Sequence, residues 1–148
     1  MSTRKGELVD AVLAGFGRTA ERALRMNQVA AAELGVNASD MQCLQLLQQG
    51  PRPAGELAAL TGLTTASMTG MIDRLEKAGF VTRVRDETDR RRVLVHLRLE
   101  RATADIAPIY HPLLGRWRGA LADYSEPELT LIADFLARIE RGFDDELS

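Results

Sequence analysis

The sequence has little of several residue types that mark other classes of protein. It holds one cysteine in 148 residues, Cys43, so no disulfide forms within the chain, as is usual in a reducing cytoplasm. Aromatic residues make up only 5%, so Leu, Val, Ile, Met and Ala must build the core. No apolar run approaches the roughly 18 residues of a membrane span, and residues 1–10 lack the apolar segment of a signal peptide. These absences predict a soluble cytoplasmic protein without membrane contact.

Signatures of catalysis and of metal binding are missing as well. The sequence shows no Ser-His-Asp or Cys-His arrangement and no glycine loop of the kind that cradles phosphates. His96 and His111 have no Cys, Asp or Glu at metal-ligand spacing. Cys43 lies beside the apolar line of a predicted helix, which favours a buried, inert thiol over a redox sensor. We therefore expect no enzymatic activity, no metal site and no cofactor.

The charged residues are unevenly distributed along an otherwise ordinary globular composition. The whole chain carries a net charge of −2. Residues 50–101 hold ten basic and seven acidic side chains, a net charge of +3, whereas the remainder holds nine and fourteen, a net charge of −5. A basic centre between acidic ends suits a nucleic-acid-binding segment carried on a separate scaffold. A solvated charged surface would give the same pattern.

Hydrophobic periodicity predicts a mainly α-helical chain with one small β-hairpin. The expected helices are a long one at 5–33, one that starts at a capping box of Ser39 and Gln42, a short one near 56–60, one at 65–78, one with an apolar stripe at 106–121, and a last one after a capping box of Ser125 and Glu128. The expected strands are 80–85 and 92–97, joined by a loop at 86–91.

Special residues set several of the predicted boundaries. Gly35 is a natural C-terminal cap for the first helix. Pro108 and Pro112 should start or kink the helix that contains them. Thr61-Gly62-Leu63 joins two helices by a tight turn, and the hairpin follows the second of them directly. This order predicts a winged helix-turn-helix.

The apolar stripes of the terminal helices are too wide for a winged module of some fifty residues to cover, so we expect them to pack against a second copy of the chain. The predicted subunit is a single unit over 1–148, with dimerisation helices at 5–36 and 102–147 around a DNA-binding lobe at 38–99. The predicted dimer contacts are Val9, Val12, Leu13, Phe16, Leu113, Trp117, Ile132, Phe135 and Ile139.

The fourth predicted helix has the surface of a recognition helix. If Met68, Ile72 and Leu75 pack inward, the opposite side presents small hydrogen-bonding side chains and one arginine. Such a surface can enter a DNA major groove and read base edges. The polar side of an ordinary amphipathic helix would look similar.

The hairpin strengthens the DNA interpretation. Three consecutive arginines in its loop repel one another unless an anion or water screens them, and an arginine at the tip of a wing can reach a narrow minor groove. Asp89 precedes them, and we expect it to hold the wing by pairing an arginine or by capping loop N–H groups. The predicted DNA contacts are Thr64, Thr65, Ser67, Thr69, Gly70, Arg74, Arg85, Arg90, Arg91 and Arg92.

Taken together, these segments resemble the multiple-antibiotic-resistance regulator (MarR) family. The resemblance covers about fifty residues and is carried by Gly55-Glu56-Leu57-Ala58, by Asp73-Arg74-Leu75-Glu76-Lys77-Ala78-Gly79-Phe80-Val81, and by the wing pair Asp89 and Arg91 of the D-x-R pattern. It implies a homodimeric repressor of a pseudo-palindromic operator on double-stranded DNA, released by a small aromatic or phenolic effector. The flanking helices agree in length and order with the family's dimerisation helices.

Two features depart from the family pattern or leave it open. Arg98-Leu99-Glu100-Arg101 replaces the usual helix cap after the second wing strand, which leaves the start of the next helix open. The first helix has no cysteine, which removes support for peroxide sensing. The spacing of Tyr110, His111 and Trp117 indicates core or dimer interface first and an effector pocket second.

Two other functions fit the same elements. One is a winged-helix module for protein assembly, with its arginines merely solvated. The other is a ligand or thiol sensor that does not bind DNA. A salt series separates DNA binding from both, because binding through several phosphates weakens steeply with salt.

Overall fold

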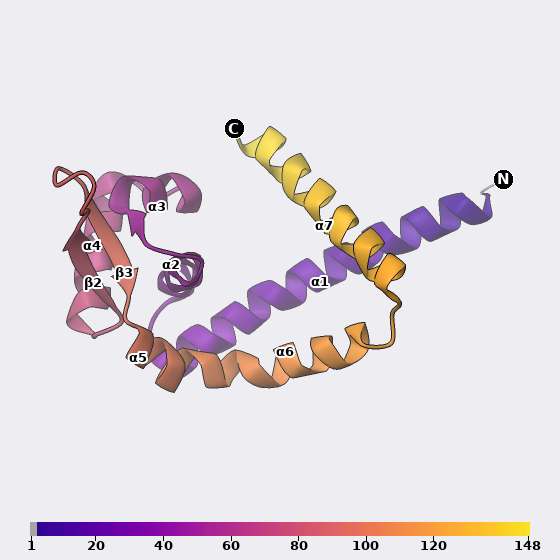
Figure 1. Ribbon diagram of the computed structural model, residues 1–148, viewed down its shortest axis with the longest axis horizontal. Coiled ribbons are helices and arrows are strands. Elements are labelled where there is room, and N and C mark those ends of the chain that lie inside the picture. The colour runs from indigo at the N-terminus through magenta and orange to yellow at the C-terminus, as the bar shows by residue number, and fades with distance from the viewer. Residues whose placement is uncertain (1–2) are drawn as a thin grey trace. The chain divides into compact units, whose positions relative to one another are not determined.

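The computed structural model describes residues 3–148 and divides the chain into two compact units, which meet between Ala107 and Pro108. The first unit contains α1 (Arg4–Leu34), α2 (Ala38–Gln48), β1 (Arg52–Pro53), α3 (Ala54–Thr61), α4 (Thr65–Lys77), β2 (Val81–Arg85), β3 (Val93–Leu97), α5 (Leu99–Arg101) and the π-helical segment η1 (Ala102–Ile106) (Figure 1). The second unit consists of α6 (Ala107–Leu121), apart from its first residue, and α7 (Glu126–Leu147). The predicted mainly helical winged fold is confirmed. None of the helices in the described part of the chain is long and apolar enough to cross a membrane.

The wing is part of a three-stranded antiparallel sheet in the order β1-β3-β2. Val81 pairs with Leu97 and Arg85 with Val93, which sets the register of the hairpin. The edge strand β1 was not predicted, because two residues are too few to show an alternating pattern. Its Pro53 is tolerated because an edge strand does not need every N–H group for pairing.

The core of the first unit lies where α2, α3 and α4 meet the sheet. Its largest fully buried side chains include Leu44 of α2, Leu57 of α3, Ile72 of α4 and Phe80 before β2. Cys43 is also fully buried, and burial, with a smaller contribution from the charge of Asp40, raises the pKa of its thiol to about 11. This is the environment of a protonated, unreactive thiol.

The helix ends show one correction to the sequence prediction. Gly35 caps α1 with a positive φ of 70°, and Ser125 and Glu128 form the predicted capping box of α7. The capping box predicted at Ser39 is wrong. Asn37 is the N-cap of α2, its Oδ1 accepts from the Asp40 N–H at 2.7 Å, and its own N–H donates to Oδ2 of Asp40 at 3.2 Å. Asn caps a helix as well as Ser does, so the helix starts about half a turn earlier.

The helix after the wing, whose start the sequence left open, begins through a π-helical turn. The Ala102 N–H donates to the Arg98 carbonyl, and the Ala107 N–H donates to the carbonyl of Ala102, five residues earlier. Pro108 has no N–H to donate, so the π-type turn lies directly before the residue that interrupts regular α-helical bonding. α6 then begins at Ala107 and continues through Pro112.

Arg101 ties this junction to the end of α4. Its Nη1 donates to the Ala78 carbonyl at 2.9 Å, and its guanidinium lies 4.2 Å from the centre of the Phe80 ring. Its Nε forms an ion pair with Oδ2 of Asp105 at 2.7 Å, at an angle outside hydrogen-bonding geometry. One side chain therefore caps α4 and packs on the residue that leads into β2.

Candidate nucleic-acid interface

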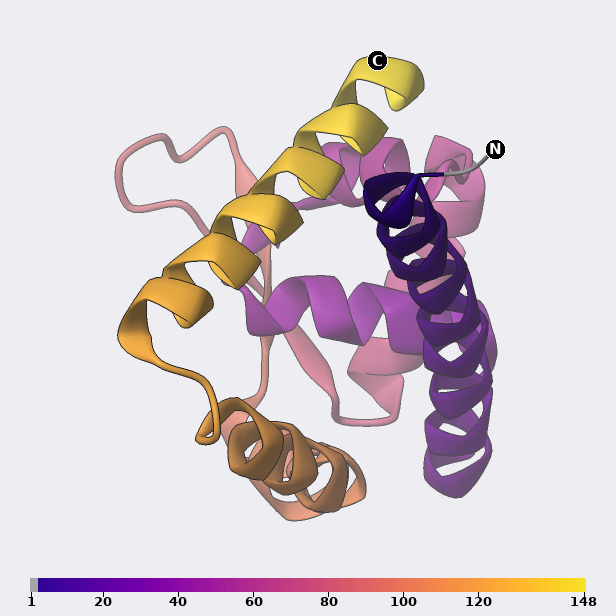
Figure 2. The ribbon, with the colours of Figure 1, turned by 90° about the vertical axis from the view of Figure 1, so that its right-hand side faces the viewer.

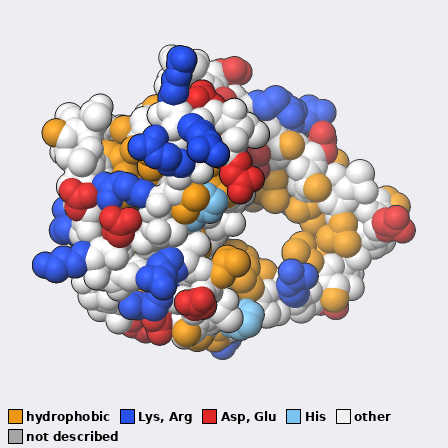
Figure 3. Space-filling view, turned by 60° about the vertical axis from the view of Figure 1, so that its left-hand side comes forward, with side chains coloured by type: hydrophobic (Ala, Val, Ile, Leu, Met, Phe, Trp, Pro, Cys, Tyr) orange, Lys and Arg blue, Asp and Glu red, His pale blue; other side chains and the backbone are white. Residues whose placement is uncertain are grey.

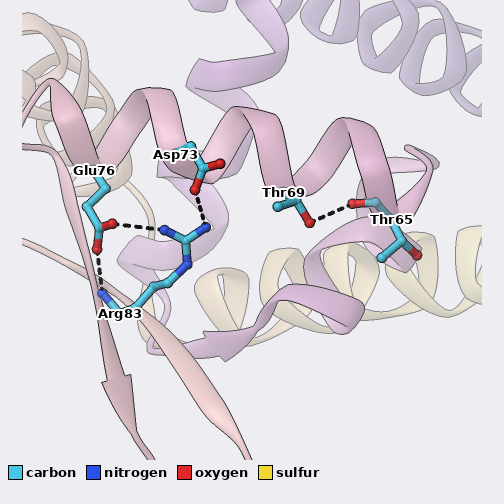
Figure 4. Close-up of polar contacts among 5 residues, drawn as sticks. All are labelled: Thr65, Thr69, Asp73, Glu76 and Arg83. Atoms are coloured by element: carbon cyan, nitrogen blue, oxygen red, sulfur yellow. Dashed lines mark hydrogen bonds and ion pairs between the residues drawn. The ribbon is translucent and has the colours of Figure 1, made fainter.

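The helix-turn-helix is formed by α3 and α4, with Gly62 between them at a φ of 72°. Thr64 is the N-cap of α4, and its Oγ1 accepts from the Ser67 N–H at 3.1 Å and donates to the Ser67 hydroxyl at 2.9 Å. The Thr69 hydroxyl donates to the Thr65 carbonyl at 3.0 Å (Figure 4). All four side chains are exposed, and their hydroxyl oxygens keep acceptor capacity for a ligand.

Burial on one side of α4 defines the side left for a partner. Met68, Met71, Ile72 and Leu75 are buried. At 100° per residue, the centre of the opposite side is formed by Ala66, Gly70, Asp73 and Lys77, with Thr65 and Thr69 along one edge and Ser67 and Arg74 along the other. A Cβ at Gly70 would meet no atom within 4 Å, so this position is open on its outer side.

Arg83 of β2 neutralises the two carboxylates of α4. Its Nη2 donates to Oδ1 of Asp73 at 2.6 Å and its Nη1 to Oε1 of Glu76 at 2.9 Å, while its backbone N–H donates to Oε2 of Glu76 at 3.1 Å (Figure 4). The bond to Asp73 is the main cause of the raised pKa of Arg83. These contacts fasten the wing to α4 and offset negative charge on a surface predicted to meet phosphates.

Arg74 forms an ion pair with α2. Its Nη2 donates to Oδ1 of Asp40 at 2.8 Å. The Asp40 side chain is 6% exposed, whereas that of Arg74 is 58% exposed. One guanidinium nitrogen of Arg74 is therefore bound to Asp40, while most of the side chain remains open to solvent.

The wing loop between β2 and β3 is the extended pink segment in Figure 2. Oδ1 of Asp86 accepts from the N–H and the hydroxyl of Thr88, which lowers the pKa of Asp86. Oδ1 of Asp89 accepts from the Arg91 N–H at 3.1 Å. This is a loop contact of the kind expected of Asp89, although its effect on DNA binding stays a prediction. Carboxylates thus hold the loop backbone.

The predicted arginines of the wing lie together on this loop and on the strand before it. Arg85 Nη1 donates to the Arg90 carbonyl at 2.8 Å, which folds its side chain along the loop. Arg90, Arg91 and Arg92 are exposed. Figure 3 shows Lys and Arg side chains recurring over the face that comes forward in that view, with acidic side chains between them. The structure therefore supplies a basic wing beside the exposed side of α4.

Two contacts of this surface were missed by sequence reasoning. Asp73 and Glu76 are three residues apart and share one side of a helix, so their joint pairing with an arginine of the next strand had a usable signal. The pairing of Arg74 with Asp40 spans 34 residues and had no such signal. The predicted set also omitted the exposed Lys77 near the end of α4.

The predicted dimer and effector residues belong to α1, α6 and α7. Val9, Val12 and Leu13 of α1 are about half exposed, and α1 buries only Ala30 and Ala31. Neither α6 nor α7 contains a buried residue. The other predicted dimer and effector residues differ in exposure. His111 and Trp117 are exposed, and the half-buried ones are Phe16, Tyr110, Leu113, Ile132, Phe135 and Ile139.

Comparison with known proteins gives a consistent result. The family model "MarR family" matches residues 36–93. An uncharacterized HTH-type transcriptional regulator of Bacillus subtilis (strain 168), YcgE, is 37% identical over 150 residues, which cover 99% of this chain and 97% of that protein. A second regulator of the same organism, YfiV, is 39% identical over 66 residues, 44% of this chain and 41% of that protein.

Solved structures show the same fold. A MarR family protein from Bacillus stearothermophilus has a TM-score of 0.64 and 24% identity, with 93% of this chain and 97% of that chain covered. The transcriptional regulator SlyA has a TM-score of 0.60 and 19% identity, with 92% and 96% covered.

Proposed function

Since this chain belongs to the MarR family and is a transcriptional regulator rather than an enzyme, we propose that it binds a pseudo-palindromic operator as a homodimer and represses transcription until a small effector releases it. The single observation that carries the DNA part is the pairing of a polar, exposed α4 with an arginine-rich wing fastened to it by Arg83. α4 would enter the major groove and the wing would reach the adjacent minor groove.

The proposed contacts divide by their chemistry. Thr65 and Thr69 offer hydroxyls along one edge of α4, which suits contacts to base edges. Arg91 would enter the minor groove while Arg90 and Arg92 lie along phosphates. Repression follows if the operator overlaps a promoter. We propose that the protein acts in the cytoplasm, where it meets this DNA.

Selection of bound sequences from a random DNA pool tests this proposal. We expect an inverted repeat whose half-sites are about one helical turn apart, and binding that weakens steeply between 50 and 200 mM salt. Reporter repression from the selected site then tests the direction of regulation. Recovery of no enriched sequence, with no salt-sensitive retention of DNA, would favour the assembly module instead.

The homodimer is proposed from the second unit and α1. Because α6 and α7 bury no residue within one chain, apolar side chains such as Leu136 (49% exposed) and Phe143 (52% exposed) need another surface to cover them. A second copy supplies the same stripes and yields the twofold symmetry that an inverted-repeat operator requires.

Sedimentation of Ile139→Asp tests the dimer. The charge would enter an apolar interface, so we expect a shift to monomer or loss of the folded state. Glu140→Gln, on the exposed side of the same helix, is the matched control and should stay dimeric. A wild-type protein that sediments as a folded monomer at micromolar concentration contradicts the proposal.

The effector part of the proposal rests on α6. Tyr110 and Trp117 are seven residues apart and share one side of this helix, where they can stack on an aromatic ligand with His111 beside them. Trp117 is the only tryptophan of the sequence, so its fluorescence reports binding directly. Titration with salicylate and related phenols should quench it and release the operator, and neither should change if no such ligand binds.

A further inference from the structure

Asp40 is an unusual feature of the first unit. Across residues 3–148 it is the one charged side chain that is buried, at 5% exposure. A carboxylate taken out of water loses its hydration, so its position requires partners that compensate the charge. Those partners show what the side chain does.

The two oxygens of Asp40 have different tasks. Oδ2 accepts from the Asn37 N–H and completes the capping box at the start of α2. Oδ1 accepts from Nη2 of Arg74, which lies 34 residues further along the chain on α4. A capping box needs only one acceptor oxygen at this position, and an uncharged Gln would provide it. The charge of Asp40 is therefore explained by Arg74.

The contact with Asp40 uses only part of the hydrogen-bonding capacity of Arg74. A guanidinium has five N–H donors in a fixed fork, and the pair with Asp40 engages Nη2 while 58% of the Arg74 side chain stays exposed. The carboxylate fixes one end of the fork. The other donors then have a defined direction at the surface of α4.

The position of Arg74 on α4 indicates which part of DNA it meets. It is the tenth of thirteen helix residues and lies about 180° around the helix from Thr65. In helix-turn-helix proteins, the first residues of the recognition helix contact bases. Arg74 lies late in the helix, beyond those residues, and on the side that pairs with α2, which suits a phosphate.

We propose that Asp40 is a positioning residue for DNA binding: it orients the guanidinium of Arg74 toward a backbone phosphate on the α2 side of the major groove. The proposal rests on the DNA-binding function proposed above. On the other edge of α4, Arg83 joins the helix to the wing, so the two ion pairs hold the recognition helix from both sides.

The test compares Asp40→Asn, Arg74→Ala and the double variant on the operator selected with wild-type protein. We expect each single variant to bind about tenfold more weakly and to lower the salt slope by about one per half-site. The double variant should bind as Arg74→Ala does, because Asp40 acts through Arg74. In ethylation interference, one phosphate per half-site should lose its effect in both single variants.

Asn37→Ala is the matched control, because it removes the other half of the capping box without touching Arg74. We expect it to lower the melting temperature and leave the salt slope unchanged. If Asp40→Asn does not fold, Arg74→Lys replaces it: this variant keeps the charge but lacks the fork, so it should lose the same phosphate contact.

The direction of the change in DNA affinity distinguishes a positioning role of Asp40 from simple repulsion of DNA. A carboxylate that only repels DNA predicts tighter binding by Asp40→Asn, and this result overturns the proposal. So does an unchanged ethylation pattern, an additive double variant, or wild-type binding by Arg74→Lys. Failure of the wild-type protein to bind any selected DNA instead overturns the proposed function.

Discussion

The contact of Arg83 with Asp73 and Glu76 predicts that a residue without a DNA contact controls operator affinity. Arg83→Ala leaves two carboxylates on α4 without their cation. The Arg83 side chain is 30% exposed, and the carboxylates are 62% and 42% exposed. Exposed ion pairs contribute about 0.2–1 kcal/mol each, so we expect the free energy of unfolding to fall by about 0.4–2 kcal/mol.

The effect on DNA binding is larger than the effect on one ion pair. A carboxylate about 7 Å from a phosphate costs on the order of 0.6 kcal/mol in water. Two carboxylates in each of two subunits therefore cost roughly 2.4 kcal/mol, which is about a 60-fold loss of operator affinity. Salt screens this repulsion, so the loss should shrink as ionic strength rises.

A rescue experiment separates this mechanism from direct contact. In the triple variant Arg83→Ala/Asp73→Asn/Glu76→Gln the carboxylate charges are absent, so operator affinity measured by fluorescence anisotropy should return to within about threefold of wild type. Arg83→Lys keeps a cation and should lose less than Arg83→Ala. If the triple variant binds as poorly as Arg83→Ala, Arg83 contacts DNA itself and the reasoning is refuted.

Three further predictions follow from the wing and the core. Asp89→Ala removes the acceptor for the Arg91 N–H and should weaken operator binding by loosening the wing, although loss of a negative charge alone would tighten it; a gain in affinity at fixed salt with an intact dimer contradicts the scaffold role. Arg91→Ala should weaken operators with A·T-rich flanks more than others, because narrow grooves attract arginine, and a uniform loss across flanks would make it a phosphate contact. Cys43, with a thiol pKa of about 11, should resist alkylation by iodoacetamide at pH 8 in the folded protein and react fully in denaturant. Because the pKa of this thiol in the folded protein lies above the ordinary value of 9.0, its contribution to stability is complete below about pH 9 and falls as the pH rises toward 11. Denaturant titration at pH 8 and pH 10.5 can detect this loss.

The fold was predictable because its elements carry strong local signals. The switch from a helical to an alternating period after Gly79, and the Ser125 and Glu128 capping box, each follow from neighbouring residues. β1 escaped prediction because a two-residue strand is defined by its partner β3 rather than by its own pattern. The start of α2 was misplaced because Asn37 and Ser39 are comparable N-caps, and the choice between them involves Asp40, whose partner is distant in sequence.

In the candidate site too, features set by neighbouring residues were predictable and features set by distant contacts were not. The polar side of α4 follows from the spacing of Met68, Ile72 and Leu75, so its exposed residues were predictable. What each charged side chain does depends on tertiary contacts. Arg74 was predicted to contact DNA, and its Nη2 is bound to Asp40 as well. Arg83 lay outside the predicted set, and it balances two acids of α4.

Arg101 closes the base of the wing by a hydrogen bond between its side chain and the backbone. By capping α4 at Ala78 it closes a loop of chain that contains the whole hairpin. Closing a loop reduces the number of conformations available to the segment inside it, and here the restriction acts at the base, where Phe80 and Val81 are buried. The tip, with its exposed arginines, is held by contacts within its own loop, among them the Asp86 N–H that donates to the Arg92 carbonyl at 2.9 Å. The base of the hairpin is therefore fixed to the end of α4, whereas its tip has only contacts within the loop, so amide exchange should slow steadily from tip to base.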